Sequence, residues 1–418
     1  MAVFVRVTET DMTNIASANR AVGSEVPFSA SVPFHERVTI QRLLSPIPEG
    51  EFRARYWEKK PLIVHREDPA YYGDLFTLQD FDASVRACRG NIKTAEATSK
   101  KVVRHQGAGP QTLERVLTDM RDGHTLVLDG MQAFNPKLGL LCRLLARETG
   151  EGFQTGVYLT PPNGKGFLPH WDNHDVFVMQ VIGFKHWKIE KARRILPPRD
   201  GVIEMQDRDL RGELHEFTLQ QGDMVYIPRG FVHAAECGSE TSLHVTMGVN
   251  HNSWDQLLNA AINAAIRRDD SLRFSLPAGY MKGDGAGIVK RLSDVLLNTA
   301  DPGFLTQVLD QFRADLVQQA GLDISGQVAA FFHPRELKLG DRIGARPGLF
   351  YIIAKEAETV TLKVGTRAIT FPDFFGKALE FALETHSYAI HDLPGDLEDD
   401  LKLVFVERLM EEALVVRK

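Results

Sequence analysis

Four ionisable residues precede an apolar run in LPHWDNHDVFVMQ, residues 168–180: His170, Asp172, His174 and Asp175. Because burying a polar group without a partner costs roughly 1–3 kcal/mol, these side chains face water, pair with one another or bind a ligand. Residues two apart in a strand share a face, so we expect His170 and Asp172 to project together. One imidazole and one carboxylate supply two ligands of a 2-His-1-carboxylate iron site, which leaves coordination positions open.

The third ligand of such a site must come from another part of the chain. QGDMVYIPRGFVHAAE places His233 after a predicted strand and a Pro-Arg-Gly turn, where a rigid scaffold would hold it. The chain has 14 histidines, so spacing alone does not select one, and His174 and His186 are alternatives. We expect His174 at the rim of the site and His186 in a structural role. A bare His-x-Asp pattern is weak evidence, because most instances are surface polar pairs.

The elements that would position these residues lie between about Phe153 and Asn250. Short β-rich runs alternate there with turn signals such as PPNG, LPPRDG, QQGD and PRG. The runs are TGVYLT, HDVFVMQVIG, KHWKIE, HEFTLQ, DMVYIP and SLHVTMGV. Many short strands with Gly/Pro turns and no long helix between them predict an antiparallel barrel or jelly roll.

Patterns along the chain predict four segments in an α+β protein. Residues 1–35 have no steady period and are expected to form an N-terminal arm. Residues 36–250 would contain the barrel and its lead-in, in which short helical stretches alternate with loops from about Thr39 to Val127. EFRARYWEKKP in this lead-in predicts an amphipathic helix stopped by proline.

The remaining two segments predict helices and then a small α/β domain. Within residues 251–334, Trp254 to Ile266 and Phe304 to Leu316 carry apolar residues at helical spacing, with Asn252 or Ser253 as a cap. These are plain domain helices or a dimer interface, and periodicity does not separate the two. In residues 335–418, LFYIIA, TVTLKV and YAIHDL predict strands, and FPDFFGKALEFALE and LEDDLKLVFVERLMEEA predict helices.

The composition predicts a soluble, cytoplasmic protein. The chain has 418 residues, 43% apolar and 25% charged, and its apolar runs are shorter than the ~20 residues of a membrane span. The start MAVFVRVTETDMTN lacks the pattern of a signal peptide. Its 3 cysteines lie far apart and form no CxxC pair, which indicates a reducing compartment and argues against a thiolate zinc site. A net charge of −6 gives no general reason to expect nucleic acid.

Longer motifs resemble the JmjC-type cupin oxygenases, in particular the cupin-4 branch that contains the ribosomal oxygenases. GVYLTPPNGKGFLPHWDNHDVFVMQVIGFKHWKIE, GDMVYIPRGFVHAAE and SLHVTMGV carry the resemblance in the barrel. YWEKKPLIV resembles the segment before that barrel, and HDLPGDLEDDLKLVFVERLMEEAL resembles a C-terminal winged helix. The resemblance covers roughly residues 39–418. It implies a double-stranded β-helix followed by a helical dimerisation region and a winged-helix domain.

The resemblance also implies a cofactor, a cosubstrate and the residues that hold them. The pattern HxD…H falls on His170, Asp172 and His233, which would bind Fe(II). The cosubstrate is 2-oxoglutarate, whose distal carboxylate would pair with Lys185, because an anion in a low-dielectric barrel needs a charged partner. Further cosubstrate-binding residues would be Tyr158, Thr246 and, as second choice beside Thr246, Ser242.

The resemblance to the ribosomal oxygenases also implies O₂ as the oxidant and hydroxylation of a side chain in a protein substrate, which would be a ribosomal protein. Residues expected near the substrate mouth are Asn163, Lys165, Phe167, Trp171, His174 and Arg229. Zinc is the alternative metal, since the same donors suit it, but a zinc hydrolase has no need of Lys185. Two alternative functions remain open: a hydroxylase of a small molecule or peptide, and a non-catalytic cupin that binds a partner.

The predicted winged helix raises the question of DNA binding. Residues 335–418 contain twelve Lys or Arg against fifteen Asp or Glu, a net charge of −3. DNA recognition requires a basic surface, so direct DNA binding is not expected. We expect instead a structural or protein-docking role for this domain, and a homodimer formed through the helical region.

Overall fold

The computed structural model describes residues 33–418 except 37, 89–91, 97–100, 106–109, 165–166, 193–194, 199–209, 211, 213, 279, 282–284, 300 and 333–335. Residues Phe34–Lys418 form one compact unit. The predicted arm, residues 1–35, lies outside the described part except for its last three residues, and so does Lys165. No described helix is long and apolar enough to cross a lipid bilayer.

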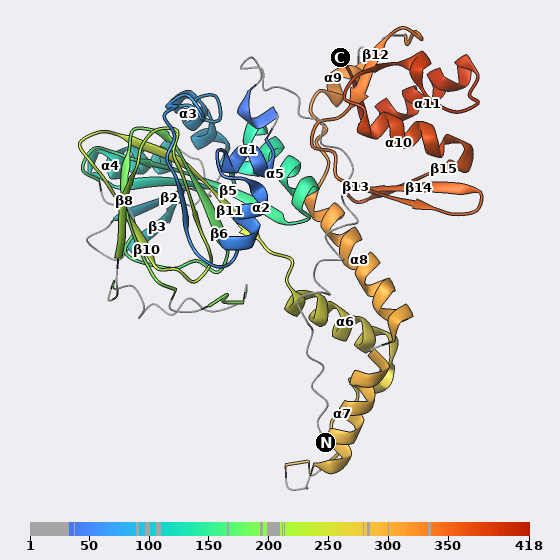
Figure 1. Ribbon diagram of the computed structural model, residues 1–418, viewed down its shortest axis with the longest axis horizontal. Coiled ribbons are helices and arrows are strands. Elements are labelled where there is room, and N and C mark those ends of the chain that lie inside the picture. The colour runs from blue at the N-terminus through green and yellow to red at the C-terminus, as the bar shows by residue number, and fades with distance from the viewer. Residues whose placement is uncertain are drawn as a thin grey trace. The chain divides into compact units, whose positions relative to one another are not determined.

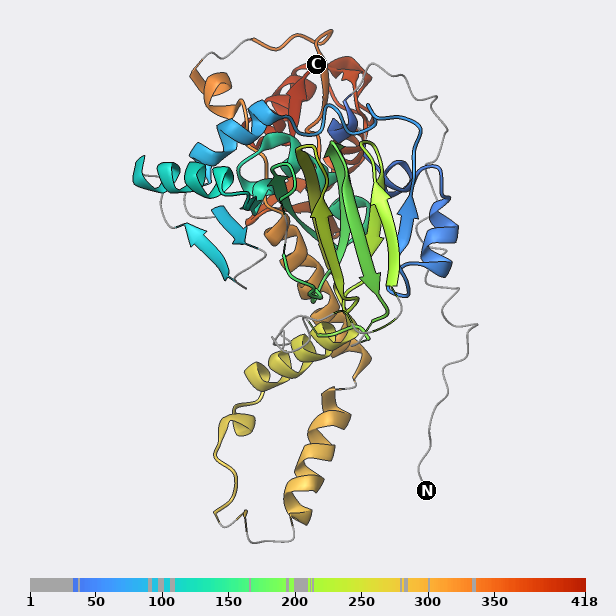
Figure 2. The same cartoon turned by 90° about the vertical axis from the view of Figure 1, so that its left-hand side faces the viewer.

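Eleven strands of the described chain form the two antiparallel sheets around the candidate site (Figures 1 and 2). The larger sheet has the strand order β1-β9-β6-β11-β5-β4-β2-β3 and the smaller one the order β10-β7-β8. In chain order the strands are β1 (Leu62–Val64), β2 (Ile92–Glu96), β3 (Lys101–His105), β4 (Thr125–Asp129), β5 (Gly152–Thr160), β6 (Asp175–Ile182), β7 (Lys185–Glu190), β8 (Leu214–Leu219), β9 (Met224–Ile227), β10 (His233–Cys237) and β11 (Ser242–Asn250).

The six predicted β-rich runs all form strands of these two sheets, β5 to β9 and β11, within two or three residues of the predicted bounds. The prediction for the lead-in was wrong in part. Helices α1 (Ile40–Leu44), α2 (Glu49–Arg55), α3 (Leu78–Ala87) and α4 (Pro110–Arg121) alternate there with strands β1 to β4. These strands are only three to five residues long, and β4 is a continuous buried run without alternation. Runs this short are ambiguous by periodicity.

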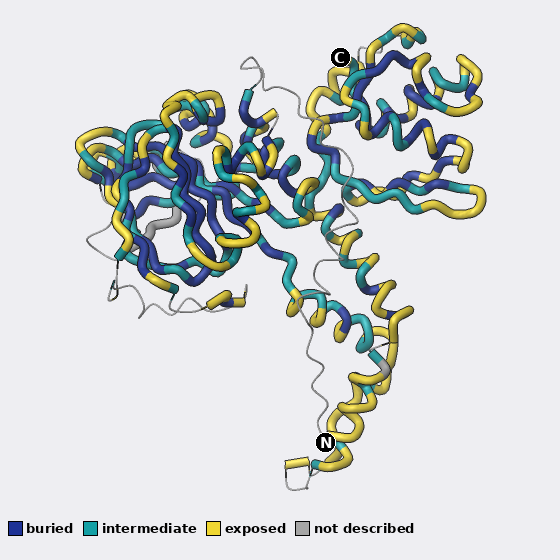
Figure 3. Tube along the Cα trace, viewed as in Figure 1, coloured by how far each residue is buried: buried dark blue, intermediate teal, exposed yellow. Residues whose placement is uncertain are grey.

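An apolar core covers one face of the larger sheet. Leu126 and Leu128 of β4, Val157 of β5 and Val245 of β11 pack into one cluster with helix α5 (Pro136–Thr149), whose Leu138 is also fully buried. Figure 3 shows the central strands as buried tube. With that face covered, alternate residues of the same strands project to the opposite face, towards the smaller sheet. This leaves an interior lined by side chains from both sheets.

The two remaining predicted segments contain the expected elements with different bounds. The helices are α6 (Trp254–Arg268), α7 (Ala286–Thr299), α8 (Pro302–Ala320), α9 (Gln327–Phe332), α10 (Gly376–Glu384) and α11 (Asp399–Glu411). The strands are β12 (Arg342–Ala345), β13 (Tyr351–Lys355), β14 (Thr359–Val364), β15 (Arg367–Pro372), β16 (Tyr388–Ala389) and β17 (Val415–Arg417). Helices α7 and α9 and strands β12, β15 and β17 were not predicted, and YAIHDL is a strand only at its first two residues.

Candidate functional site

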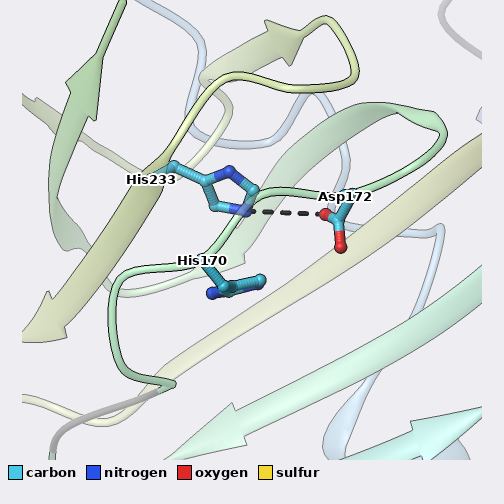
Figure 4. Close-up of side chains that lie close together, drawn as sticks. All are labelled: His170, Asp172 and His233. Atoms are coloured by element: carbon cyan, nitrogen blue, oxygen red, sulfur yellow. Dashed lines mark ion pairs between the residues drawn. The ribbon is translucent and has the colours of Figure 1, made fainter. Parts of the chain in front are cut away.

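His170 and His233 face each other across a two-residue bridge between the loop before β6 and the start of β10. Each donates its backbone N–H to the other's carbonyl, with N···O distances of 3.1 and 2.8 Å. Their ring centroids lie 4.5 Å apart. The Asp172 carboxylate completes the group: Oδ2 lies 3.6 Å from His233 Nε2, and one ligand atom from each of the three residues lies within 4.8 Å of the others (Figure 4).

The local backbone differs from the strand that the sequence predicted. Strand β6 begins at Asp175, so His170 and Asp172 lie in the preceding loop and strand alternation does not align them. A tight turn at Pro228–Gly230 fixes the loop instead, because the Gly230 N–H donates to the Asp172 carbonyl at 2.9 Å. Gly230 has a φ of +87°, which glycine adopts without steric cost. The turn that ends three residues before His233 therefore also holds Asp172.

Backbone carbonyls set the orientation of both imidazoles. Nδ1 of His170 lies 2.8 Å from the Leu168 carbonyl, and Nδ1 of His233 lies 3.1 Å from the Phe231 carbonyl. Because a carbonyl only accepts, each neutral ring carries its proton on Nδ1 and keeps a free lone pair on Nε2. This is the tautomer in which both Nε2 atoms act as metal ligands.

The electrostatic environment favours a neutral His233 imidazole beside an ionised Asp172 carboxylate. Burial, together with the neighbouring His170, lowers the pKa of His233 to about 4. Burial opposes ionisation of Asp172, but His174, His170 and His233 outweigh it and hold the pKa of Asp172 below its usual value. Metal ligands must be deprotonated, and both residues have that form at neutral pH.

The three residues line a cavity of about 810 Å³ that is walled by both sheets. Lys185, the first residue of β7, lines the same cavity and is 2% exposed. Burial lowers the pKa of Lys185 to about 8. No carboxylate of the described residues pairs with this ammonium. A buried cation without a counter-ion costs free energy, so this cavity wall is suited to an anionic ligand.

Tyr158, Thr246 and His244 also line this cavity. Tyr158 of β5 and His244 of β11 are directly opposed in the antiparallel ladder, and their rings stack with centroids 4.7 Å apart. Burial and the Lys185 charge lower the pKa of His244 well below its usual value. Two buried ring atoms on this wall, His244 Nδ1 and Trp187 Nε1, have no hydrogen-bond partner among the described residues. They are free to bind a polar ligand.

Several residues named from the sequence lie elsewhere. Ser242 is fully buried and accepts a hydrogen bond from Gln180 Nε2 at 2.8 Å, away from the cavity wall. Asn163 is exposed and does not line the cavity. The Arg229 guanidinium points into the protein, where it pairs with Asp175 at 3.2 Å and Glu58 at 2.7 Å. The placement of Arg229 at a substrate mouth is therefore corrected.

The other predicted residues are divided between the cavity and the surface. Trp171, His174 and Phe167 line the cavity. Gly248 leaves room for the His174 ring, since a Cβ there would lie 2.6 Å from its Cδ2. His186 is exposed on the outer side of β7, with Nδ1 2.7 Å from the Thr218 hydroxyl, and does not line the cavity.

Sequence reasoning missed the wall that strands β2 and β4 provide. Lys93 of β2 and Asp129 of β4 form an ion pair that lines the cavity. Trp187 and His244 were missed as well. The alternation of side chains along β7 and β11 could have identified both residues. Trp187 shares a face with Lys185, and His244 shares one with Thr246. Lys93 and Asp129 gave no such signal, because the lead-in was not predicted to contain strands.

Residues 130–257 match the JmjC domain family model. Among curated proteins, Ribosomal oxygenase 1 of Gallus gallus is 36% identical over 255 residues, covering 57% of this chain and 42% of that protein. Ribosomal oxygenase 2 of Rattus norvegicus is 30% identical over 308 residues, covering 68% of this chain and 64% of that protein. The first of these alignments spans less than half of the curated relative.

The fold is also similar to solved structures. The crystal structure of the Escherichia coli ribosomal oxygenase YcfD superposes with a TM-score of 0.54 at 16% identity, covering 89% of this chain and 98% of that one. A structure of YcfD in complex with cobalt and 2-oxoglutarate gives a TM-score of 0.53 at 15% identity. At this identity the likeness concerns the fold. It confirms the predicted JmjC and cupin architecture.

Proposed function

We propose that this chain, which carries a JmjC domain and is related to the ribosomal oxygenases, is an Fe(II)- and 2-oxoglutarate-dependent oxygenase that hydroxylates a side chain of a protein. One observation carries the proposal. His170, Asp172 and His233 converge in the same cavity in which a buried Lys185 has no counter-ion among the described residues. A metal site alone would leave the buried cation unexplained, whereas a chelating dianion accounts for both features.

The donor set fits iron in the ferrous state. Two neutral imidazoles and one carboxylate form the facial arrangement of non-haem Fe(II) oxygenases. Zinc accepts the same donors, but the adjoining cationic wall favours a metal that shares its site with an anionic cosubstrate. Bound Fe(II) would supply the oxidative decarboxylation of 2-oxoglutarate and the transfer of one oxygen atom of O₂ to the substrate.

The protein residues bind and orient the reactants. Lys185 pairs with the distal carboxylate of 2-oxoglutarate, and the hydroxyls of Tyr158 and Thr246 on the same wall hydrogen-bond the cosubstrate. The Leu168 and Phe231 carbonyls keep the Nδ1 protons of His170 and His233 away from the metal. The apolar side chains of Val176 and Val178 line the cavity and limit the access of water.

The substrate is proposed to be a protein, and a ribosomal one in view of the names of the relatives. Trp171 and His174, beside the metal ligands, and the Lys93–Asp129 pair from the opposite strands are its proposed contacts. The proposal is tested by incubating the iron-loaded protein aerobically with ribosomal proteins from its source and 2-oxoglutarate. One substrate side chain should gain one oxygen atom by mass spectrometry, with one succinate formed per hydroxylation. Succinate formation coupled to a small metabolite, with no modified protein, would favour the small-molecule alternative.

A homodimer through the helical region is part of the proposal. Trp254, Leu258 and Ile262 form a stripe on α6 that is 73%, 60% and 44% exposed. Ala261, which lies beside this stripe on the same helix, is covered by Phe304 and Val308 of α8. Leu292 and Leu296 of α7 are also more than half exposed. Figure 3 shows this region mostly as exposed tube. Apolar area of this extent on helices is typical of an interface.

The last segment is proposed to be a winged-helix-like domain that docks a protein. Helices α10 and α11 and the three-stranded sheet β13-β14-β15 share one apolar core, in which Phe375 stacks on Phe405 with centroids 4.6 Å apart. The net charge of −3 over residues 335–418 argues against DNA as the partner. The cytoplasm is the proposed location, since all 3 cysteines are free and buried.

A further inference from the structure

A second polar cluster lies behind the metal-binding loop. Asp175, three residues after Asp172, is fully buried and does not line the cavity. Its carboxylate accepts hydrogen bonds from the Tyr226 hydroxyl, from the Arg229 backbone N–H at 3.0 Å and from Arg229 Nη1 at 3.2 Å. His251 Nε2 lies 3.1 Å from the same carboxylate. The proposed reaction assigns no role to any of these residues.

Arg229 connects this cluster to a segment far away in the sequence. Its Nη2 lies 2.7 Å from Glu58 Oε1, so the guanidinium bridges two carboxylates. Glu58 belongs to the motif YWEKKP and has a φ of +57°, a backbone conformation rare for residues other than glycine. The Glu58 N–H donates to the Tyr226 hydroxyl at 2.8 Å, and the Trp57 ring stacks on Tyr226 with an interplanar angle of 8°.

The cluster reaches the metal ligands through the Pro228–Gly230 turn. Asp175 binds both the backbone and the side chain of Arg229, the middle residue of that turn. The next residue, Gly230, donates its N–H to the Asp172 carbonyl. The chain then continues to Phe231, whose carbonyl accepts from His233 Nδ1. One buried carboxylate thus holds a turn that contacts Asp172 and leads directly into Phe231, whose carbonyl orients His233.

We propose that Asp175 and Arg229 are positioning residues of the metal centre: their ion pair, held from outside by Glu58, fixes the turn that orients Asp172 and His233. This inference rests on the proposed metal site and deepens it. It also gives the motif YWEKKP a role. A buried ion pair contributes little net stability compared with apolar residues of similar size, whereas groups that orient metal ligands commonly change metal affinity by about 10–100-fold when removed.

The test compares two variants of this cluster with a matched control. Asp175→Asn keeps the shape and removes the charge, and Glu58→Gln does the same at a partly exposed position. The control is Asp223→Asn. Asp223 is equally buried and accepts from the Arg66 and Gln220 backbone N–H groups at 2.8 and 2.9 Å, but it contacts neither the Pro228–Gly230 turn nor a metal ligand.

Two quantities are measured on the full chain: thermal unfolding of the metal-free protein, and Co²⁺ affinity by calorimetry. We expect Asp175→Asn to weaken Co²⁺ binding about 10-fold or more and Glu58→Gln about threefold. The Co²⁺ affinity of Asp223→Asn should stay within about twofold of that of the parent, even if this substitution lowers the unfolding temperature as much as Asp175→Asn does. If Asp175→Asn does not fold, the loss of affinity in Glu58→Gln decides the matter.

Two results would overturn the inference. Unchanged Co²⁺ affinity in the folded cluster variants would show that the cluster is structural only, and so would an equal loss in Asp223→Asn. In both cases the parent still binds Co²⁺ and the proposed function stands. A parent that binds no Co²⁺ would remove the metal site, and with it both the proposed function and this inference.

Discussion

The Nδ1 atoms of His170 and His233 both lie within hydrogen-bond distance of a carbonyl two residues earlier in the chain, Leu168 for one and Phe231 for the other. The two local motifs are alike although the residues are 63 positions apart. Each fixes a neutral imidazole with its Nε2 lone pair free. Because the backbones of the two residues also pair directly, the distance between the rings is set by the fold and needs no ligand to establish it.

Removing a proposed ligand should strongly weaken metal binding without unfolding the protein. His170→Ala and Asp172→Ala each leave two of three ligands, and we expect the Co²⁺ or Fe²⁺ affinity to fall at least about 100-fold, since each lost ligand costs several kcal/mol of binding free energy. Calorimetry under anaerobic conditions measures this, and circular dichroism verifies the fold. The control is His186→Ala, which removes an exposed imidazole outside the cavity. Metal affinity equal to the parent in Asp172→Ala would show that this carboxylate is not a ligand.

Replacing Lys185 should affect stability and cosubstrate binding in opposite directions. Its pKa falls from 10.5 to about 8 on folding. Below pH 8 the buried charge therefore lowers the free energy of unfolding by on the order of 3 kcal/mol. We expect Lys185→Met to raise the unfolding temperature of the ligand-free protein and to weaken 2-oxoglutarate binding about 100-fold, as for a lost buried charge pair. Lys188→Met on the same strand serves as the control, because its ammonium lies 3.9 Å from Glu216 outside the cavity. If both variants behave alike, Lys185 is not the anion-binding residue.

The affinity for 2-oxoglutarate should fall as the pH rises through about 8. The free protein loses the Lys185 proton near that pH, whereas a bound carboxylate stabilises the ammonium and raises its pKa. Binding at pH 9 must therefore take up a proton, while binding at pH 7 need not. Calorimetry in buffers of different ionisation enthalpy, with the metal present, measures this proton uptake. In Lys185→Arg, whose guanidinium stays charged, the proton uptake should vanish, and its persistence would assign it to another group.

Adding a charge to the exposed stripe of α6 should dissociate the proposed dimer. Leu258 is 60% exposed in the single chain, and a carboxylate buried in an interface without a partner costs more than a dimer of moderate affinity can offset. Leu258→Glu should halve the mass measured by light scattering at micromolar concentration. The control is Asn259→Glu, which adds the same charge at the next exposed position. A parent that is already monomeric would contradict the dimer.

The strands of the barrel were predictable because the sequence has strand-forming residues within each run and turn residues between the runs. β5, β6, β7 and β11 combine β-branched or aromatic residues with Gly and Pro turns. Helix α6 was predictable from the spacing of its apolar residues, but that spacing does not indicate which of these residues are covered. Leu257 and Ala261 share the periodic face with Leu258, and only the position of Phe304 and Val308 of α8 shows that Ala261 is covered and Leu258 exposed.

The sequence predicted the site residues whose types and motifs are distinctive at their positions. It did not predict the direction of a side chain whose partners lie far away in the chain. His-x-Asp stands shortly before an apolar run, and the longer motifs around it and around Lys185 carry the family resemblance. Arg229, by contrast, lies within a turn that precedes a proposed ligand, and the sequence is the same whether its guanidinium faces a substrate or a buried carboxylate. Its partners are 54 positions away at Asp175 and farther still at Glu58. Pairing over such distances depends on the packing of both sheets.

The coupling between the metal site and the lysine wall is tested most directly by anaerobic titration of 2-oxoglutarate with and without Fe²⁺. If both lie in one functional cavity, the iron-loaded protein should bind one equivalent of 2-oxoglutarate, and omission of iron or the Asp172→Ala substitution should weaken that binding about 100-fold or more, because each removes the chelated end of the ligand. Equal affinity with and without iron, or no binding in either state, would contradict the account.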